Sequence, residues 1–157
     1  MCIRDRKQIE GGWLAQTQGP PKIDWNSIES VTKKEFTESD IMLAKFGTAV
    51  ISDVKSNAIL LVSTTKTGFA TVGVGPGQTS RVEAVRIAAR RAGDRAKGSM
   101  MISDAFFPFR DGIDTANEIG VESIVQPGGS MRDSDSITAA DEHDMSMIFT
   151  NRRLFLH

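Results

Sequence analysis

Apolar and polar residues alternate along the chain with periods that change from helical to extended and back. Between Ser39 and about Asp53 the apolar residues recur at helical spacing, which predicts an amphipathic helix. Residues 58–62 and 70–74 are short β-rich runs separated by a polar stretch, and this arrangement predicts a hairpin. Later runs predict strands at 100–102, 123–126 and 145–149 and helices at 114–119 and 134–142.

A further helix is predicted from Ser80 to about Ala96. Ser80 and Glu83 have the spacing of a capping box, in which two side chains close the first turn of a helix. Basic residues lie mostly off the apolar stripe of this helix, as is typical of a solvated face. The predicted buried stripe consists of Val82, Val85, Ala89, Ala92 and Ala96.

The predicted elements follow one another as a helix, two strands and then three helix–strand pairs. This alternation predicts one α/β domain with three layers and a mixed sheet. Residues 11–36 predict a short strand around Trp13 and then an extended connector. Residues 1–6 show no periodicity, and we expect them to be a non-native segment outside a domain that spans residues 7–157.

Composition narrows the classes of protein. A chain of 157 residues fits one domain with a real core. The net charge of −1 gives no broad cationic field, so we expect neither nucleic acid nor a membrane surface as a partner. No apolar run approaches the roughly 18 residues of a membrane span, and the expected location is the cytosol. The single cysteine, Cys2, excludes an internal disulfide, and two histidines leave little for a metal site, so we expect no metal.

Residues 103–111 concentrate three aromatic rings beside charged side chains. Phe106, Phe107 and Phe109 lie within a few residues of Arg110 and Asp111. Such a cluster favours a flat apolar slot with polar groups at its rim, which suits a planar heterocycle. The alternative is that the rings anchor a loop in the core and Asp111 caps the following helix.

Two glycine-rich turns follow predicted strands. Residues 73–78 contain three glycines, which let the backbone turn tightly before the helix that begins near Arg81 and approach a ligand. Residues 127–130 repeat this pattern after a later strand. Ligands of open α/β sheets collect at the carboxyl ends of strands, so we expect loops around Gln78, Phe106 and Ser130 to converge. Each turn could instead be only a bend that ends a strand.

Several segments, in this order along the chain, resemble one family of enzymes. The chain is similar to the carboxyl-terminal end of the bifunctional purine biosynthesis proteins, which join aminoimidazole carboxamide ribonucleotide (AICAR) transformylase to IMP cyclohydrolase. The similarity covers roughly residues 7 to 157. The segments that carry it are Val54–Ile59, Val72–Arg81, Ser103–Asp114, Ile124–Ser130, Ala139–His143 and Phe149–Phe155.

The resemblance implies a cytidine-deaminase-like fold and a set of site residues. The implied AICAR contacts are Asn57, Arg81, Phe106 and Arg153, and Asn57 would orient the reacting groups. The implied folate contacts are Val82, Asp111, Ser130 and Met131. Without the resemblance, Asn57 is better explained as a turn cap and Arg153 as an ordinary exposed cation.

The resemblance further implies transfer of a formyl group from 10-formyltetrahydrofolate to AICAR, without a metal, in a homodimer. The family's catalytic Lys-His pair has no counterpart in the chain, which therefore looks like a fragment, and neither His143 nor His157 is placed to act as the base. The zinc deaminases need His-x-Glu and Pro-Cys-x-x-Cys, and both motifs are missing. A non-catalytic nucleotide-binding or dimerisation module of the same fold is the alternative.

Overall fold

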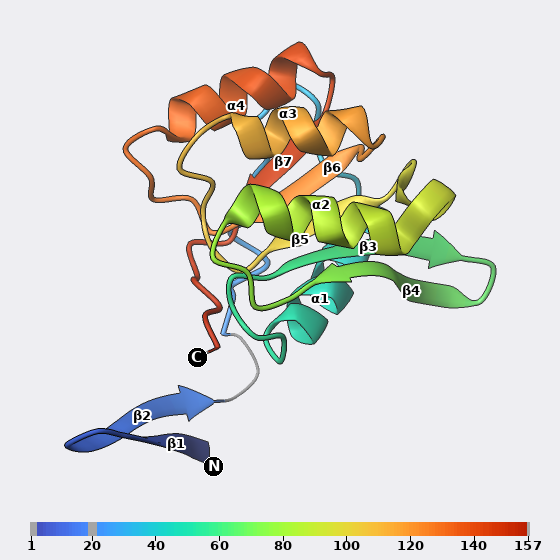
Figure 1. Ribbon diagram of the computed structural model, residues 1–157. Helices are drawn as coiled ribbons and strands as arrows, with labels where there is room; N and C mark the ends of the chain where they lie inside the picture. The colour runs from blue at the N-terminus through green and yellow to red at the C-terminus, as the bar shows by residue number, and fades with distance from the viewer. Residues whose placement is uncertain (1–2, 19–21, 157) are drawn as a thin grey trace.

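The computed structural model describes residues 3–18 and 22–156 and is built around a five-stranded sheet in the order β4-β3-β5-β6-β7 (Figure 1). The sheet strands are β3 (Ile59–Thr65), β4 (Gly68–Gly75), β5 (Met100–Ser103), β6 (Ser123–Gln126) and β7 (Ser146–Phe149). The helices are α1 (Glu38–Ile51), α2 (Arg81–Ala92), α3 (Asp111–Glu118) and α4 (Asp133–Glu142). Each predicted strand and helix of this part of the chain is present in the predicted order.

The direction of the strands decides which loops meet. β3 pairs antiparallel with both β4 and β5, whereas β5, β6 and β7 are parallel. The carboxyl ends of β4, β5, β6 and β7 therefore lie at the same edge of the sheet as the amino end of β3. This edge collects the loops that the sequence singled out.

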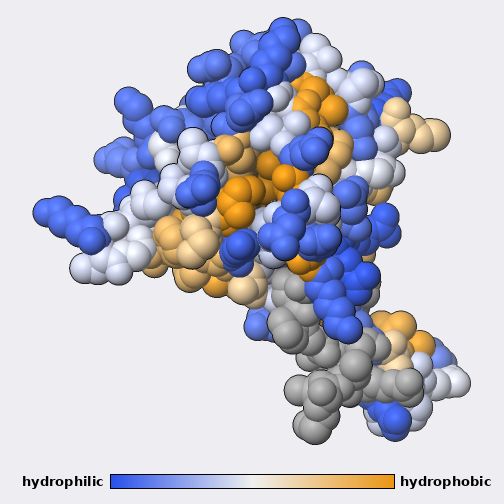
Figure 2. Space-filling view, turned by 180° about the vertical axis from the view of Figure 1, so that it is seen from behind, coloured by the Kyte–Doolittle hydropathy of each residue, from blue (hydrophilic) through white to orange (hydrophobic). Residues whose placement is uncertain are grey.

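Helices cover both faces of the sheet. α2, α3 and α4 lie on one face and α1 lies on the other (Figure 1). Two apolar clusters match these layers, one joining the sheet to α2, α3 and α4 and one joining it to α1 and the segment around Trp25 and Phe36. Viewed from behind, apolar side chains collect among polar ones on the α1 side (Figure 2). The prediction of a three-layer α/β domain with a mixed sheet is confirmed.

Helix boundaries follow local capping chemistry. α1 begins one residue before the predicted Ser39 because Thr37 and Asp40 form a reciprocal capping box. α3 begins at Asp111 rather than at Asp114, and the chain leaves it through Gly120 at φ +79°.

The prediction of a capping box at α2 is wrong. Ser80 is the N-cap residue, but its side chain makes no capping hydrogen bond. The helix also stops at Ala92, since Gly93 has φ +57° and only a short 3-10 turn, Gly93–Ala96, follows. The buried stripe is shifted from the predicted one and consists of Ala84, Val85, Ala88 and Ala92.

Gly73 and Gly75 of β4 allow α2 to pack directly on the strand. A Cβ atom on Gly73 would lie 2.2 Å from the carbonyl oxygen of Ala88, and one on Gly75 would lie 2.0 Å from that of Ala84. Both glycines therefore serve helix–strand packing, and the interpretation that they let the backbone approach a ligand is wrong for them. Gly77, at φ +66°, does form the expected turn.

The N-terminal part of the chain forms a hairpin of β1 (Ile3–Ile9) and β2 (Gly12–Gln18) that projects from the domain (Figure 1). The predicted strand at Trp13 is present, but its partner β1 includes residues 3–6, which the sequence analysis places outside the domain. Met1, Cys2, Gly19–Pro21 and His157 lie outside the described residues. The described part of the connector, residues 22–36, is not extended throughout, because it has a turn at 25–27 and bends at 31–34. At Ser30 it forms a bridge with Ile148 of β7.

Candidate functional site

A cavity of about 560 Å³ lies at the end of the sheet where the carboxyl end of β5 meets the amino end of β3. Its walls come from Asn57, which lies two positions before β3, from the first turn of α2 and the two residues before it, and from the segments after β5 and β7. Six of the eight predicted site residues line it, namely Asn57, Arg81, Val82, Phe106, Asp111 and Arg153. A cavity of this size holds a drug-sized ligand or a nucleotide.

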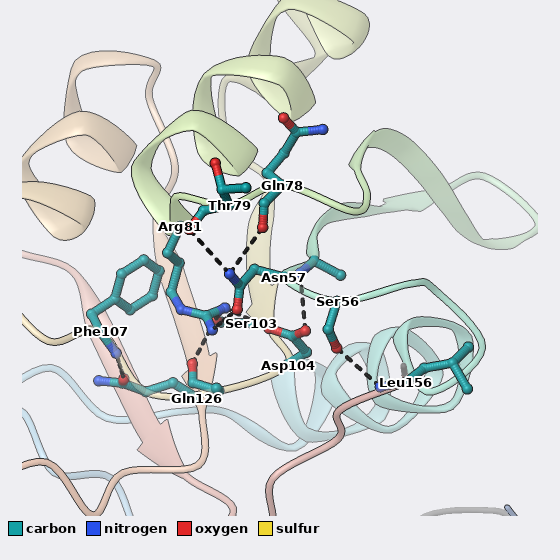
Figure 3. Close-up of polar contacts among 12 residues, drawn as sticks. Ser56, Asn57, Gln78, Thr79, Arg81, Ser103, Asp104, Phe107, Gln126 and Leu156 are labelled. Carbon is teal, nitrogen blue, oxygen red and sulfur yellow. Dashed lines mark hydrogen bonds and ion pairs between the residues drawn. The ribbon is translucent and has the colours of Figure 1, made fainter. Parts of the chain in front are cut away.

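Arg81 is held by a network of polar side chains in the wall of this cavity (Figure 3). Its Nη1 forms an ion pair with Asp104 Oδ1 and donates to Ser103 Oγ at 3.1 Å. Its Nη2 donates to Asn57 Oδ1 at 2.9 Å. The Arg81 side chain is only 9% exposed, so this cation depends on these partners for compensation.

Asn57 spans two segments that are distant in sequence. Its Nδ2 donates to the carbonyl of Gln78 at 2.9 Å, while its Oδ1 accepts from Arg81. The backbones of Asn57 and Gln78 also exchange hydrogen bonds of 3.2 and 3.1 Å. A local turn cap would bond to its own turn, so the alternative interpretation of Asn57 as such a cap is wrong.

The aromatic segment divides between core and cavity. Phe107 is fully buried, its ring leaves no room for a side chain at Gly112, and its N–H donates to Gln126 Oε1 at 2.9 Å. Phe106 is half-buried and Phe109 is exposed, and both line the cavity together with Phe107. One ring therefore anchors the loop, as the core interpretation expected, while the other two offer an aromatic wall to a ligand.

Arg153 provides a cation beside this wall. Its guanidinium carbon lies 5.6 Å from the ring centroid of Phe106 and 5.2 Å from that of Phe155. Stacking on two rings limits the positions that the charged group can adopt. The Arg153 side chain is otherwise exposed, so its charge is accessible from the cavity.

Asp111 offers a carboxylate at the rim. It is the first residue of α3, and Arg110 occupies the N-cap position, so the alternative interpretation of Asp111 as a cap is met only by a hydrogen bond within the first turn. One carboxylate oxygen accepts the N–H of Gly112 at 2.8 Å. The Asp111 side chain is exposed and leaves acceptor capacity on the cavity side.

Ser130 and Met131 lie outside the cavity. The carboxylate of Asp133 accepts the N–H groups of Gly129 at 2.7 Å and Ser130 at 3.2 Å, and Met131 is fully exposed. The loop approaches the rim only through Arg132, whose guanidinium carbon lies 5.0 Å from the Phe109 ring centroid. Of the three loops expected to converge, those around Gln78 and Phe106 meet at the cavity. The third wall comes from the segment around Arg153 and not from the loop around Ser130.

Three residues of this site had no role in the sequence interpretation. Asp104 and Gln126 are fully buried polar side chains that hold Arg81 and the Phe107 backbone, and Phe155 stacks on Arg153. Asp104 and Gln126 each lie at the end of an apolar strand, and this position in the sequence could have indicated that they have a structural role. A polar group there must find a partner or stay unpaired in the core.

A second polar cluster joins α3 to α4 away from the cavity. Arg110 donates to Asp114 at 3.0 Å and to Glu142 Oε2 at 2.6 Å, and His143 Nε2 lies 2.8 Å from Asp114 Oδ1. The hydrogen bonds from Arg110, with a smaller effect of His143, lower the pKa of Asp114. His143, the C-cap residue of α4, is therefore part of a contact between helices.

Within residues 3–18 and 22–156 no helix has the length and apolarity needed to cross a bilayer. No group of three or more His, Cys, Asp or Glu side chains in this part of the chain is arranged to hold a metal ion.

Comparison with known proteins agrees with the motifs. The bifunctional purine biosynthesis protein PurH of Dinoroseobacter shibae is 46% identical over 161 aligned positions, which cover 96% of this chain and 30% of that protein. RibD of Acinetobacter baumannii is a structural neighbour with a TM-score of 0.44 and 14% identity, covering 69% of this chain and 32% of that one, and this likeness is too low to support an argument. The model of the AICARFT/IMPCHase bienzyme family matches residues 3–91, more than half of the chain, and the chain therefore belongs to this family.

Proposed function

We propose that this chain forms the AICAR-binding part of a transformylase site that moves a formyl group from 10-formyltetrahydrofolate to the exocyclic amine of AICAR. The observation that carries the proposal is the meeting of Asn57, Arg81, Phe106 and Arg153 in one cavity, although they come from four separate segments. The resemblance had selected these four residues from motifs alone.

The chemistry of the four side chains fits the parts of AICAR. Arg153 carries an accessible positive charge suited to the phosphate. Phe106 offers a ring face to the planar aminoimidazole. Asn57 and Arg81 supply amide and guanidinium groups that suit the carboxamide, and their mutual hydrogen bond of 2.9 Å fixes them relative to each other.

The folate co-substrate would bind next to this group. The carboxylate of Asp111 can accept paired hydrogen bonds from the amino and ring N–H groups of a pterin, and Val82 adds apolar surface. Ser130 and Met131, which do not line the cavity, would contact the part of the folate that extends beyond the rim.

In the transfer step the amine nitrogen of AICAR attacks the formyl carbon, and a base takes one amine proton. The bond between the formyl carbon and the folate nitrogen then breaks, and that nitrogen leaves with a proton in place of the formyl group, as tetrahydrofolate. No described residue that lines the cavity is a histidine or lysine. The chain spans 30% of the length of the Dinoroseobacter shibae relative, so the base would come from the remainder of such a protein. The homodimer implied by the resemblance and the cytosolic location expected from the sequence stay predictions.

Because no histidine or lysine among the described residues lines the cavity, a second function is considered, namely a module that binds the ribonucleotide without catalysis. A chimera distinguishes the two functions. In it, this chain replaces the matching region of the Dinoroseobacter shibae relative, and tetrahydrofolate release is followed with both substrates. Formyl transfer by the chimera and none by the chain alone supports the transformylase. Binding of AICAR without transfer in the chimera supports the binding module.

Arg153→Ala in the chimera tests the site itself. A charge-assisted contact to phosphate is worth about 1.5–3 kcal/mol, so the Michaelis constant for AICAR should rise about tenfold or more. Arg90→Ala is the matched control, because Arg90 is an exposed arginine of α2 that does not line the cavity. An unchanged Michaelis constant in the Arg153→Ala variant would refute the phosphate role.

A further inference from the structure

Asp104 is the residue at which the segments of the cavity meet. It follows β5 directly and is fully buried, and no motif gave it a role. A carboxylate removed from water in this way must be paired and hydrogen-bonded to remain charged. The partners that Asp104 binds therefore indicate its role in the structure.

Three segments bind to Asp104 through different atoms. Oδ1 pairs with the Arg81 guanidinium at the start of α2. Oδ2 accepts the N–H of Ala58, the residue after Asn57, at 2.9 Å (Figure 3). The main-chain carbonyl accepts the N–H of Leu154, the residue after Arg153, at 2.8 Å.

Each of these partners is, or directly follows, a proposed AICAR contact. Arg81 is bound itself, Asn57 and Arg153 are bound through the next residue, and Phe106 is two positions along the same segment. Asp104 thus bonds to the segments of Asn57, Arg81 and Arg153 and belongs to the segment of Phe106.

The ion pair also determines which N–H groups of Arg81 remain for a ligand. A guanidinium has five N–H donors in a rigid plane. Asp104 and Ser103 engage Nη1, and Asn57 engages one N–H of Nη2. None of these three partners engages the Nε–H and the second Nη2–H, so these are the donors of Arg81 that a ligand in the cavity would use.

We propose that Asp104 is a positioning residue of the AICAR site, which acts through Arg81 and the Asn57–Ala58 peptide and does not touch the ligand. This inference rests on the proposed function. It predicts that the charge of Asp104 matters for AICAR specifically, because folate would bind at Asp111 and Val82. A carboxylate that served only the fold would affect stability and both substrates together.

The test compares Asp104→Asn and Asp104→Glu with the unaltered chimera. Both oxygens of Asp104 face N–H donors, so an amide would turn its own NH₂ group toward Arg81 or toward Ala58. We expect Asp104→Asn to raise the Michaelis constant for AICAR about tenfold or more while that for the folate changes less than about twofold. Asp104→Glu keeps the charge and should recover part of the AICAR affinity.

Two controls separate positioning from loss of stability. Ile148 is fully buried on the α1 side of the sheet, so Ile148→Val and Ile148→Ala should lower stability by a smaller and a larger amount. These two variants give a range of melting temperatures with which the Asp104 variants are compared. In an Arg81→Ala background, Asp104→Asn should cause little further change in the Michaelis constant for AICAR. Pairing with Asp104 should restrict rotation of the Arg81 guanidinium, so nitrogen-15 spectra of the unaltered 157-residue chain should show separate resonances for its two Nη groups. In the Asp104→Asn variant these resonances should merge into one averaged signal.

The outcomes are distinct. AICAR-specific weakening with non-additivity supports the inference. Equal weakening of both substrates that tracks the Ile148 variants overturns it, as does an unaltered Michaelis constant in Asp104→Asn. If the Asp104 variants do not fold, Ser103→Ala gives the decision, because it removes the other Nη1 partner of Arg81 and should weaken AICAR alone. Failure of the unaltered chimera to bind AICAR refutes the proposed function, and this inference with it.

Discussion

A methyl group at Gly75 would force α2 away from β4. Gly75 is the last residue of β4 and is buried, and the carbonyl oxygen of Ala84 in α2 lies 2.0 Å from the position that a Cβ atom would take. The obstructing atom belongs to the backbone, so no side-chain rotation relieves the clash. Gly75→Ala therefore tests whether close helix–strand packing explains this glycine.

The expected magnitude follows from the geometry. An ordinary contact begins near 3.4 Å, so the strand end and the first turns of α2 must separate by 3.4 − 2.0, or about 1.4 Å. Overpacking of this kind costs about 1–3 kcal/mol. For a domain of this size each kcal/mol lowers the melting temperature by about 2–4 °C, so we expect a fall of about 2–12 °C. Arg81 opens α2 and moves with it, which should also weaken AICAR binding.

The assay is a melting curve by circular dichroism with Gly12→Ala as the matched control. A Cβ atom at Gly12 would have no neighbour within 4 Å. The control should melt within about 2 °C of the unaltered protein, as surface substitutions usually do. If the melting temperature of Gly75→Ala equals that of the Gly12→Ala control, the packing explanation is refuted.

Two further substitutions test Asp111 and the cluster between α3 and α4. Asp111→Asn should lower folate affinity with little change in melting temperature, because the amide keeps the size of the carboxylate but loses its charge and paired acceptors; calorimetry and a melting curve decide. Asp114→Asn should destabilise the protein in a pH-dependent way. Arg110 depresses the pKa of Asp114 below its ordinary value of 3.8, so this stabilisation is present above pH 3.8 and fades as the pH falls through the lower folded value. Melting temperatures of the two proteins should therefore differ at neutral pH and converge in strong acid; a constant difference would contradict the assignment.

The order of helices and strands could be predicted because each element carries its own periodicity. α1 and β6 illustrate this, since their apolar spacing alone gave boundaries within about two residues. The sheet edge could also be anticipated, because polar and glycine-rich turns follow several of the strands. Family motifs then selected Asn57, Arg81, Phe106 and Arg153, which line one cavity.

Long-range contacts could not be read from the sequence. Gly73 and Gly75 resemble a flexible turn until α2 is placed on them, since the carbonyl groups that exclude a side chain come from the next helix. Asp104 looks like one more polar residue of a loop until Ala58, Arg81 and Leu154 reach it from other segments. Ser80 has the spacing of a capping box, but that spacing does not determine where its hydroxyl points.

The antiparallel direction of β3 is what makes the cavity possible. In an all-parallel sheet, the residue before a strand lies at the edge opposite to the strand ends. Here β3 runs against β4 and β5, so Asn57 lies beside the loops that leave those strands. Asp104 can then bind the Asn57–Ala58 peptide and Arg81 at once, across three neighbouring strands. A strand start among strand ends thus places the Asn57 amide next to the Arg81 guanidinium.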